Sequence, residues 1–255
     1  QLYNGIIRPD QIAITSGCNQ AFAAVIAALT TEGDEIILPT PWYFNHKMWL
    51  DMTGVRAVAL DMGADFLPDP DQARRLIGSK TKAIVLISPN NPTGVEYSPA
   101  QIEAFYLLAR EHGIPLILDE TYRAFRIADG PAHDIFADPD WPDVFIHLYS
   151  FSKSFHLSGH RIGAIASSAS FISQVAKFLD TVTICPTGVG KSAALWGLQH
   201  LDDWLEIERQ KILSRGDTVR QVFKSLETHG WTRHSSGAYF AYVEHPEAAN
   251  FETAA

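Results

Sequence analysis

One lysine stands between two serines in the segment Ser150-Phe-Ser-Lys153-Ser-Phe-His-Leu-Ser-Gly-His-Arg161-Ile-Gly163, and an arginine follows it eight residues later. A lysine amine can act as a nucleophile, and serine hydroxyls together with a guanidinium suit a phosphate dianion. Taken alone, the segment also fits a solvated loop with a surface lysine and arginine. Three further segments decide between these interpretations.

The first of them is a glycine turn near the start of the chain. Residues 12–15 form a short β-type run that stops at Ser16-Gly-Cys-Asn19, and residues 20–29 are typical of an apolar, alanine-rich helix. A glycine turn between a strand and a helix start exposes backbone amides that bind phosphate readily. Many α/β turns share this composition, so the turn indicates a phosphate site only in combination with other motifs.

The second segment is a buried strand, residues 83–88, that ends in the rigid polar turn Pro89-Asn-Asn-Pro-Thr-Gly94. Asn91 offers both a donor and an acceptor at the carboxyl end of this strand, which is the usual ligand side of an α/β sheet. An ordinary Asn-Pro turn explains the same residues equally well.

The third segment, Pro115-Leu-Ile-Leu-Asp119-Glu-Thr-Tyr122, ends another apolar strand in a carboxylate, with a phenol three residues later. A buried acid is costly unless it meets a positive partner, and a pyridinium nitrogen would be one. A Tyr122 hydroxyl at this spacing could reach the phenolic oxygen of the same ring. The alternative is an acid that caps the following turn, with the tyrosine in the core.

In chain order these motifs resemble those of the fold-type I pyridoxal-phosphate enzymes, specifically the aspartate aminotransferase-like class I/II aminotransferases. The resemblance covers roughly residues 6 to 245 and depends on the order and spacing of six elements. They are Ser16-Gly-Cys-Asn, Pro41-Trp-Tyr43, Asn91-Pro-Thr-Gly, Asp119-x-x-Tyr122, Ser150-x-Ser-Lys153 and Arg161.

The resemblance implies a role for each matching residue, with pyridoxal 5′-phosphate as the cofactor. Lys153 would form the internal aldimine and then move the proton between Cα and C4′. Asp119 would keep the pyridine nitrogen protonated, and Asn91 and Tyr122 would hydrogen-bond the ring oxygen O3′. Lys153, Asp119 and Tyr122 are therefore the implied catalytic residues.

The remaining implied residues hold the ring and the phosphate. Tyr43 matches the family's ring-stacking aromatic, whereas Trp42 is better explained as a core or lid residue. The implied phosphate ligands are the backbone amides of Gly17, Cys18 and Asn19 with the side chains of Ser150, Ser152 and Arg161.

The coarse pattern of the chain predicts an α/β fold independently of these motifs, because apolar strand-like runs alternate with helical patterns. We expect a large domain with a mostly parallel sheet of about seven strands flanked by helices, followed by the start of a truncated C-terminal small domain. The expected strands lie near residues 12–15, 35–39, 56–60, 83–88, 115–119, 144–149 and 162–167.

The domain boundary is expected at residue 229. Residues 1–229 form the large cofactor-binding domain, including a long connecting helix from Asp202, and residues 230–255 begin the small domain. The run Gly237–Val243 is predicted as the first strand of that domain. The resemblance also implies an N-terminal arm and a later arginine that binds the substrate carboxylate, and the chain contains neither, so we expect it to be a fragment.

Composition narrows the class of protein. The chain has 255 residues, 46% of them apolar, enough for a substantial core. Its 20 basic and 29 acidic residues give 20 − 29 = −9, which argues against nucleic acid as a partner. Two cysteines are too few for a disulfide framework, so a cytoplasmic location is expected. No apolar run approaches the ~20 residues of a membrane helix.

Three other motifs resemble a P-loop, a zinc site or a calcium loop, but each lacks a required residue. No metal site is expected. Gly188-Val-Gly-Lys191-Ser resembles the end of a P-loop, but position 185 is cysteine and not glycine, so Lys191 is assigned to the first turn of a helix. His156 and His160 have metal-like spacing without a glutamate between them. Asp65, Asp69 and Asp71 are better explained as helix-capping residues.

The sequence therefore favours an aminotransferase that moves an amino group from an amino acid to a 2-oxo acid. A lyase or decarboxylase of the same fold remains open, as does a non-catalytic aminotransferase-like sensing domain of a transcription regulator. The resemblance implies a homodimer, with residues 183–187 close to the interface.

Overall fold

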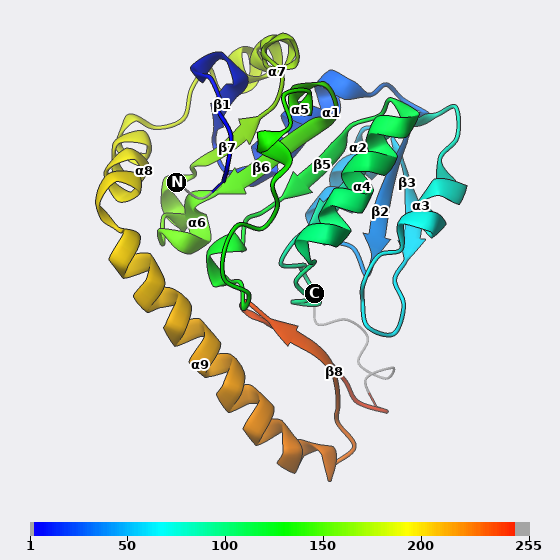
Figure 1. Cartoon of the computed structure of the whole chain (residues 1–255), viewed down its shortest axis with the longest axis vertical. Coiled ribbons are helices and arrows are strands. Elements are labelled where there is room, and N and C mark those ends of the chain that lie inside the picture. Colours follow the sequence, from blue (N-terminus) through cyan, green and yellow to red (C-terminus); the bar gives the residue numbers. More distant parts are fainter. Residues whose placement is uncertain (1–2, 248–255) are drawn as a thin grey trace.

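The computed structural model of the chain describes residues 3–247 and contains a seven-stranded sheet with helices on both faces (Figure 1). Residues 248–255, the end of the expected small domain, lie outside the described residues. The strands of this sheet are β1 Ile12–Thr15, β2 Glu35–Thr40, β3 Arg56–Asp61, β4 Thr81–Ile87, β5 Leu116–Asp119, β6 Phe145–Ser150 and β7 Gly163–Ala166.

The helices alternate with these strands along most of the chain. They are α1 Cys18–Leu29, α2 Phe44–Met52, α3 Pro70–Leu76, α4 Pro99–His112, α5 Trp141–Val144, α6 Phe151–Ser154, α7 Ala169–Val182, α8 Gly188–His200 and α9 Asp202–Glu227. Short 3₁₀ turns are η1 Pro9–Gln11, η2 Arg123–Phe125, η3 Ile135–Ala137 and η4 Ser158–His160.

The sheet is mostly parallel, as the sequence predicted. Its strand order is β1-β7-β6-β5-β4-β2-β3. The five strands from β3 to β6 pair in parallel, while β7 is antiparallel to both β6 and β1. The predicted α/β class and the seven expected strands are confirmed, with each strand within about two residues of its expected position.

Alternation along the strands builds a core on each face of the sheet, because successive side chains of a strand point to opposite sides. In β4, Ile84 and Leu86 pack with Phe105 of α4 in one core. Ala83 and Val85 pack with α1, α2 and α7 in the other. Central strands that are apolar on both faces read as continuous hydrophobic runs, which is why β4, β5 and β6 are evident in the sequence.

Strand direction explains why distant polar motifs meet. The strands β4, β5 and β6 run in parallel, so the turns that follow them lie at one edge of the sheet. Since β1 runs parallel to β6 across the antiparallel β7, the glycine turn after β1 and the residues just before β7 reach the same edge. Five separate segments of the chain therefore converge there.

Side-chain and glycine caps define the ends of several helices. The Ser98 hydroxyl accepts from Gln101 N at the start of α4, and Gly113 ends this helix in a left-handed conformation. Asp69 accepts from Asp71 N at the start of α3. Lys191 lies in the first turn of α8, as predicted.

The long helix α9 runs away from the sheet and leads into a separate hairpin, β8 Thr232–Gly237 and β9 Phe240–Glu244, which turns back toward the large domain (Figure 1). The prediction of one strand over residues 237–243 is wrong, because residues 238–239 form the turn between two strands. The polar residues of β8 gave no apolar alternation, and this strand depends on its pairing with β9.

Among residues 3–247, no helix combines the length and apolar character needed to span a membrane.

Candidate active site

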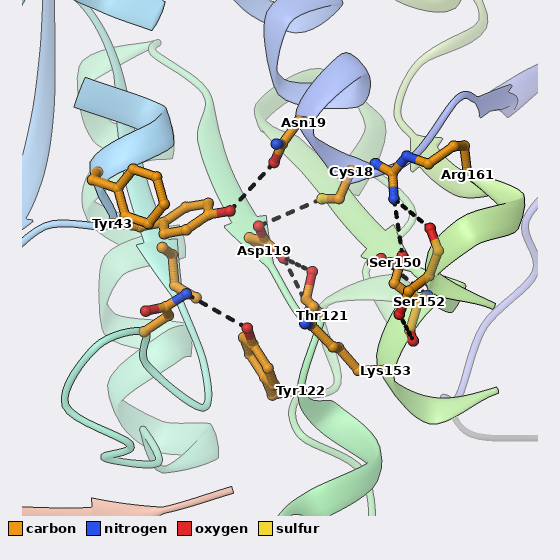
Figure 2. Close-up of a pocket in the computed structure, with 14 residues that line it drawn as sticks. Cys18, Asn19, Tyr43, Asp119, Thr121, Tyr122, Ser150, Ser152, Lys153 and Arg161 are labelled. Atoms are coloured by element: carbon orange, nitrogen blue, oxygen red, sulfur yellow. Dashed lines mark hydrogen bonds between the residues drawn. The ribbon is translucent and has the colours of Figure 1, made fainter. Parts of the chain in front are cut away.

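A cavity of about 320 Å³ lies at the sheet edge where the five segments converge, and Figure 2 shows its lining. Ten of the eleven residues predicted from the sequence line it, Gly17 being the exception. Sequence reasoning missed Phe44, Ile87, Thr121 and Ser158, which line the same cavity.

One end of the cavity is formed by the start of α1. No side chain caps the first turn of this helix, so its amides can bind an anion. The Gly17 amide donates to the Thr15 carbonyl at 2.9 Å in this structure. Gly17 has φ of 89°, a conformation that L side chains rarely adopt, and a Cβ there would lie 2.1 Å from an Arg161 Nη atom. The phosphate-binding role of the Gly17 amide stays a prediction, and Cys18 and Asn19 begin the helix.

Arg161 completes this end of the cavity. Its backbone is left-handed, with φ of 55°, and its Nη1 donates to the Ser158 carbonyl at 2.9 Å and to the Ser152 hydroxyl at 3.4 Å. Ser150 accepts from Ser152 N at 3.2 Å and so caps the short helix that carries Lys153. A guanidinium, two hydroxyls and a helix start together form an anion-binding end.

Asp119 lies in the middle of the cavity lining, with 4% of its surface exposed. Thr121 holds its Oδ1 through the backbone amide at 2.9 Å and the hydroxyl at 2.7 Å, and the Cys18 thiol donates to Oδ2 at 3.5 Å. Burial raises the pKa of Asp119, although these hydrogen bonds oppose the shift. The carboxylate is thus fixed in position but deprived of solvent.

The histidine that faces Asp119 does not supply a charge. His46 Nε2 lies 3.7 Å from Asp119 Oδ2, and its ring stacks on Phe22 with 3.8 Å between centroids. Burial lowers the pKa of His46 to about 3, so the imidazole is neutral at physiological pH. Within the described part of the chain, Asp119 has no cationic partner within 4 Å. The sequence offered no signal for His46 beyond its position three residues after Tyr43.

Opposite Asp119 and Arg161, the cavity carries a pair of neutral hydrogen-bonding groups. Asn91 Nδ2 donates to the Tyr122 hydroxyl at 3.5 Å, and burial raises the pKa of Tyr122, which stays protonated. The Tyr43 hydroxyl accepts from Asn45 Nδ2 at 2.7 Å and donates to Asn19 Oδ1 at 3.4 Å. The Tyr43 side chain lines the cavity on the α2 side (Figure 2).

Lys153 enters the same cavity from α6, which follows β6 directly. Its side chain is half-buried, and it shares the cavity with the Asp119 carboxylate and the Tyr122 phenol (Figure 2). An amine, a buried uncompensated acid, a neutral phenol–amide pair and an anion-binding end suit one ligand. That ligand is flat, cationic at one edge and anionic at one end, as a protonated pyridoxal phosphate is, so the residues present fit this cofactor.

Comparison with known proteins agrees with this chemistry. Residues 3–254 match the family model for aminotransferase class I and II. The chain belongs to the class I and II aminotransferases. Enzymes of this class depend on pyridoxal 5′-phosphate.

Individual relatives are aminotransferases of several specificities. An aromatic aminotransferase (ISS1) of Arabidopsis thaliana is 27% identical over 93% of this chain and 61% of its own length. An aspartate aminotransferase of Thermotoga maritima is 32% identical over 77% of this chain and 52% of its own length. Both of these relatives are named as aminotransferases.

Solved structures show the same fold. A mutant of the aspartate aminotransferase of Thermus thermophilus superposes with a TM-score of 0.85 at 27% identity, over 93% of this chain and 65% of that one. The N-succinyldiaminopimelate aminotransferase of Mycobacterium tuberculosis gives a TM-score of 0.84 at 25% identity, over 93% of this chain and 62% of that one. The chain thus spans about three fifths of the length of these relatives.

His156 and His160, which have metal-like spacing in the sequence, are not part of a cluster of metal ligands among the described residues. His156 Nε2 lies 3.6 Å from Glu208 of α9, and its ring packs against Trp204. Among the described residues, no group of three or more His, Cys, Asp or Glu side chains is placed to hold a metal ion.

Behind Asp119, its neighbour Glu120 is fully buried in a polar cluster. Glu120 Oε2 lies 2.8 Å from His147 Nε2 and 3.7 Å from His133 Nε2, and the Tyr3 hydroxyl donates to it. Burial alone would raise the pKa of Glu120, but the facing imidazoles of His133 and His147 hold it well below its ordinary value. Through Glu120, this cluster holds the backbone of the turn between Asp119 and Tyr122 in place.

Replacing Glu120 by glutamine should lower the free energy of unfolding at pH 7 by about 3 kcal/mol, because the charge-assisted hydrogen bonds are lost. A depressed pKa stabilises the fold above the ordinary value of 4.5, and the contribution disappears as the pH falls through the folded-state pKa. The difference between the two proteins should therefore shrink below about pH 4.5. Denaturant unfolding at several pH values measures it, with the exposed Glu103→Gln as control. A difference independent of pH would contradict the assignment.

Proposed function

We propose that this chain is the cofactor-binding part of a pyridoxal-phosphate-dependent aminotransferase that moves an amino group from an amino acid to a 2-oxo acid. The observation that carries the proposal is the buried Asp119, which faces a cavity shared with Lys153 and has no cationic partner within 4 Å among residues 3–247. A protonated ring nitrogen supplies the missing charge, and an amine in the same cavity supplies the nucleophile.

The cofactor, when bound, supplies an aldehyde and a ring that accepts electron density from the substrate Cα. Lys153 would hold the cofactor through its amine, and the free amine would serve as the base that accepts and returns the substrate proton. Asp119 would keep the ring nitrogen protonated and so favour electron flow toward the ring. Asn91 and Tyr122 would donate to the ring oxygen, and Tyr43 would pack on the ring face.

The phosphate is held at the anion-binding end of the cavity. The amides of Cys18 and Asn19 lie at the start of α1, and Arg161 supplies the positive charge. The hydroxyls of Ser150 and Ser152 complete the set. This end orients the cofactor, because a doubly charged phosphate binds best where a helix start and a guanidinium meet.

The proposal extends to organisation and location. Residues 1–229 form the cofactor-binding domain and residues 230–255 begin the small domain, since α9 separates the sheet from the hairpin. A homodimer is proposed because α8 and the segment before it expose large apolar side chains, among them Ile184, Val189 and Trp196. A cytoplasmic location agrees with the two free cysteines.

An absorbance experiment tests the proposed function. Purified full-length protein with pyridoxal phosphate should show a visible band that borohydride abolishes. The band should fall when an amino donor is added and return with a 2-oxo acid, with stoichiometric exchange of the amino group. Release of ammonia or carbon dioxide in place of this exchange would indicate lyase or decarboxylase chemistry, and the absence of any band would rule out the proposal.

A further inference from the structure

The β8–β9 hairpin docks on the loop that carries Asn91, although the two segments are more than 130 residues apart in the sequence (Figure 1). The Ser235 hydroxyl donates to the Thr93 carbonyl at 2.6 Å, and both residues are buried. A buried hydroxyl with a single short hydrogen bond to a backbone carbonyl is a specific contact, because leaving that carbonyl unpaired would be costly.

Two glycines meet backbone to backbone beside this hydrogen bond. A Cβ added to Gly237 would lie 2.1 Å from the Gly94 carbonyl oxygen, and one added to Gly94 would lie 2.5 Å from Gly237 N. Neither approach can be relieved by a side-chain rotation, since the obstructing atoms belong to the backbone. Gly94 has φ of 75°, a left-handed conformation that glycine adopts without strain, whereas Gly237 needs to be glycine for space alone.

The loop that receives the hairpin is internally rigid. Gly94 N donates to the Asn90 carbonyl at 2.8 Å, and Asn90 N donates to the Val95 carbonyl at 2.8 Å. The Asn90 side chain accepts from the amide and the hydroxyl of Thr93 at 3.1 and 2.8 Å. A displacement of Thr93 or Gly94 is therefore transmitted to Asn91, which lies inside this closed turn.

The hairpin also touches the partner of Asn91. Phe240 packs edge-on against the Tyr122 ring with 5.0 Å between centroids, and the Tyr239 ring lies edge-on to it at 6.0 Å. Tyr122 is thus in direct contact with the hairpin, and its partner Asn91 lies in the turn on which the hairpin docks.

We propose that the β8–β9 hairpin sets the geometry of the Asn91–Tyr122 pair, and that Ser235, Gly94 and Gly237 are positioning residues for the hydrogen bonds to the cofactor ring oxygen. The proposal builds on the function proposed above. If the hairpin moves, Asn91 and Tyr122 both lose their fixed positions. A docked hairpin keeps the two side chains at the distance from each other that binding to the ring oxygen requires.

The glycine contact is tested by adding single methyl groups. Gly237→Ala should raise the dissociation constant of pyridoxal phosphate at least about tenfold, because the hairpin is pushed off the loop. Gly113→Ala is the matched control for Gly94→Ala, since Gly113 is also left-handed, with φ of 64°, but has nothing within 4 Å of an added Cβ. If Gly113→Ala weakens pyridoxal phosphate binding as much as Gly94→Ala does, the effect comes from backbone strain, and the proposal is overturned.

Ser235→Ala tests the coupling itself with a variant that keeps the fold. Hydrogen exchange of the amides in residues 90–95 should accelerate, and the pH midpoint of the visible cofactor band should shift upward by about 0.5 to 1 unit, as the loss of one hydrogen bond implies. Ser236→Ala removes a hydroxyl that accepts from Arg233 at 3.4 Å and should change neither quantity. Normal cofactor binding by wild type with an unshifted midpoint in Ser235→Ala would overturn this inference and leave the proposed function intact. A wild type without any visible band would overturn both.

Discussion

Lys153→Ala should abolish amino-group transfer and the visible cofactor band together, with activity at least about 10⁴-fold below that of the wild type. The loss is this large because Lys153 is proposed both to attach the cofactor and to move the proton at Cα, two contributions that act as a unit. The variant should still bind pyridoxal phosphate noncovalently, since Arg161, Ser150 and Ser152 line the cavity with side chains that do not depend on the Lys153 amine. Equilibrium dialysis separates this binding from the spectral loss.

The exposed Lys191→Ala provides the control for removing a lysine from the protein surface, since Lys191 lies on α8 outside the cavity lining. It should keep the band and the full rate. A Lys153→Ala protein that retains a borohydride-sensitive band would show that another amine holds the cofactor, and the assignment of the cavity would then fail.

Asp119→Asn should lower the rate of transamination by about 10² to 10³-fold, the range seen when one electrostatic partner of a reacting group is removed. The amide cannot keep the ring nitrogen protonated, so electron density from Cα has no positive centre to reach. The same substitution should stabilise the cofactor-free protein at pH 7. Burial raises the pKa of Asp119 above its ordinary 3.8, so stability falls as the pH rises through this window, and asparagine removes that cost.

Opposite signs for activity and stability distinguish this prediction from simple damage to the fold. The gain in the free energy of unfolding should vanish below about pH 3.8, where Asp119 is protonated in both states. Asp203→Asn, at an exposed position in the first turn of α9, should change neither quantity. A cofactor-free Asp119→Asn protein that is less stable than the wild type at pH 7 would show that the carboxylate is already compensated within the chain.

Much of the site could be predicted from the sequence because its parts are local. A strand that is apolar on both faces and ends in a polar turn identifies the ligand edge of an α/β sheet, so Asn91, Asp119 and Lys153 stood out individually. Each motif specifies its own backbone turn with nearby residues only. The order and spacing of these motifs along the chain then indicated the family and, through it, the remaining site residues.

Contacts between segments could not be predicted in this way. His46 lies on α2, far from Asp119 in the sequence, and its approach depends on how α2 packs against the sheet. The crowding of Gly17 by Arg161 depends on a left-handed backbone at position 161. The strand β8 was missed because its stability comes from pairing with β9, and not from an apolar pattern of its own.

The amino-acid sequence by itself determined which chemical groups are present at the ends of the strands, because hydrophobic periodicity and turn residues act over a few neighbours. The tertiary structure alone decided that the Asp119 carboxylate is buried with no cation within 4 Å among residues 3–247, that Arg161 crowds Gly17, and that the hairpin presses Gly237 onto Gly94. These features arise where parts of the chain that are distant in the sequence pack together, because packing removes water from Asp119 and leaves no room for a side chain at the glycines. Such contacts depend on the packed arrangement and not on local sequence.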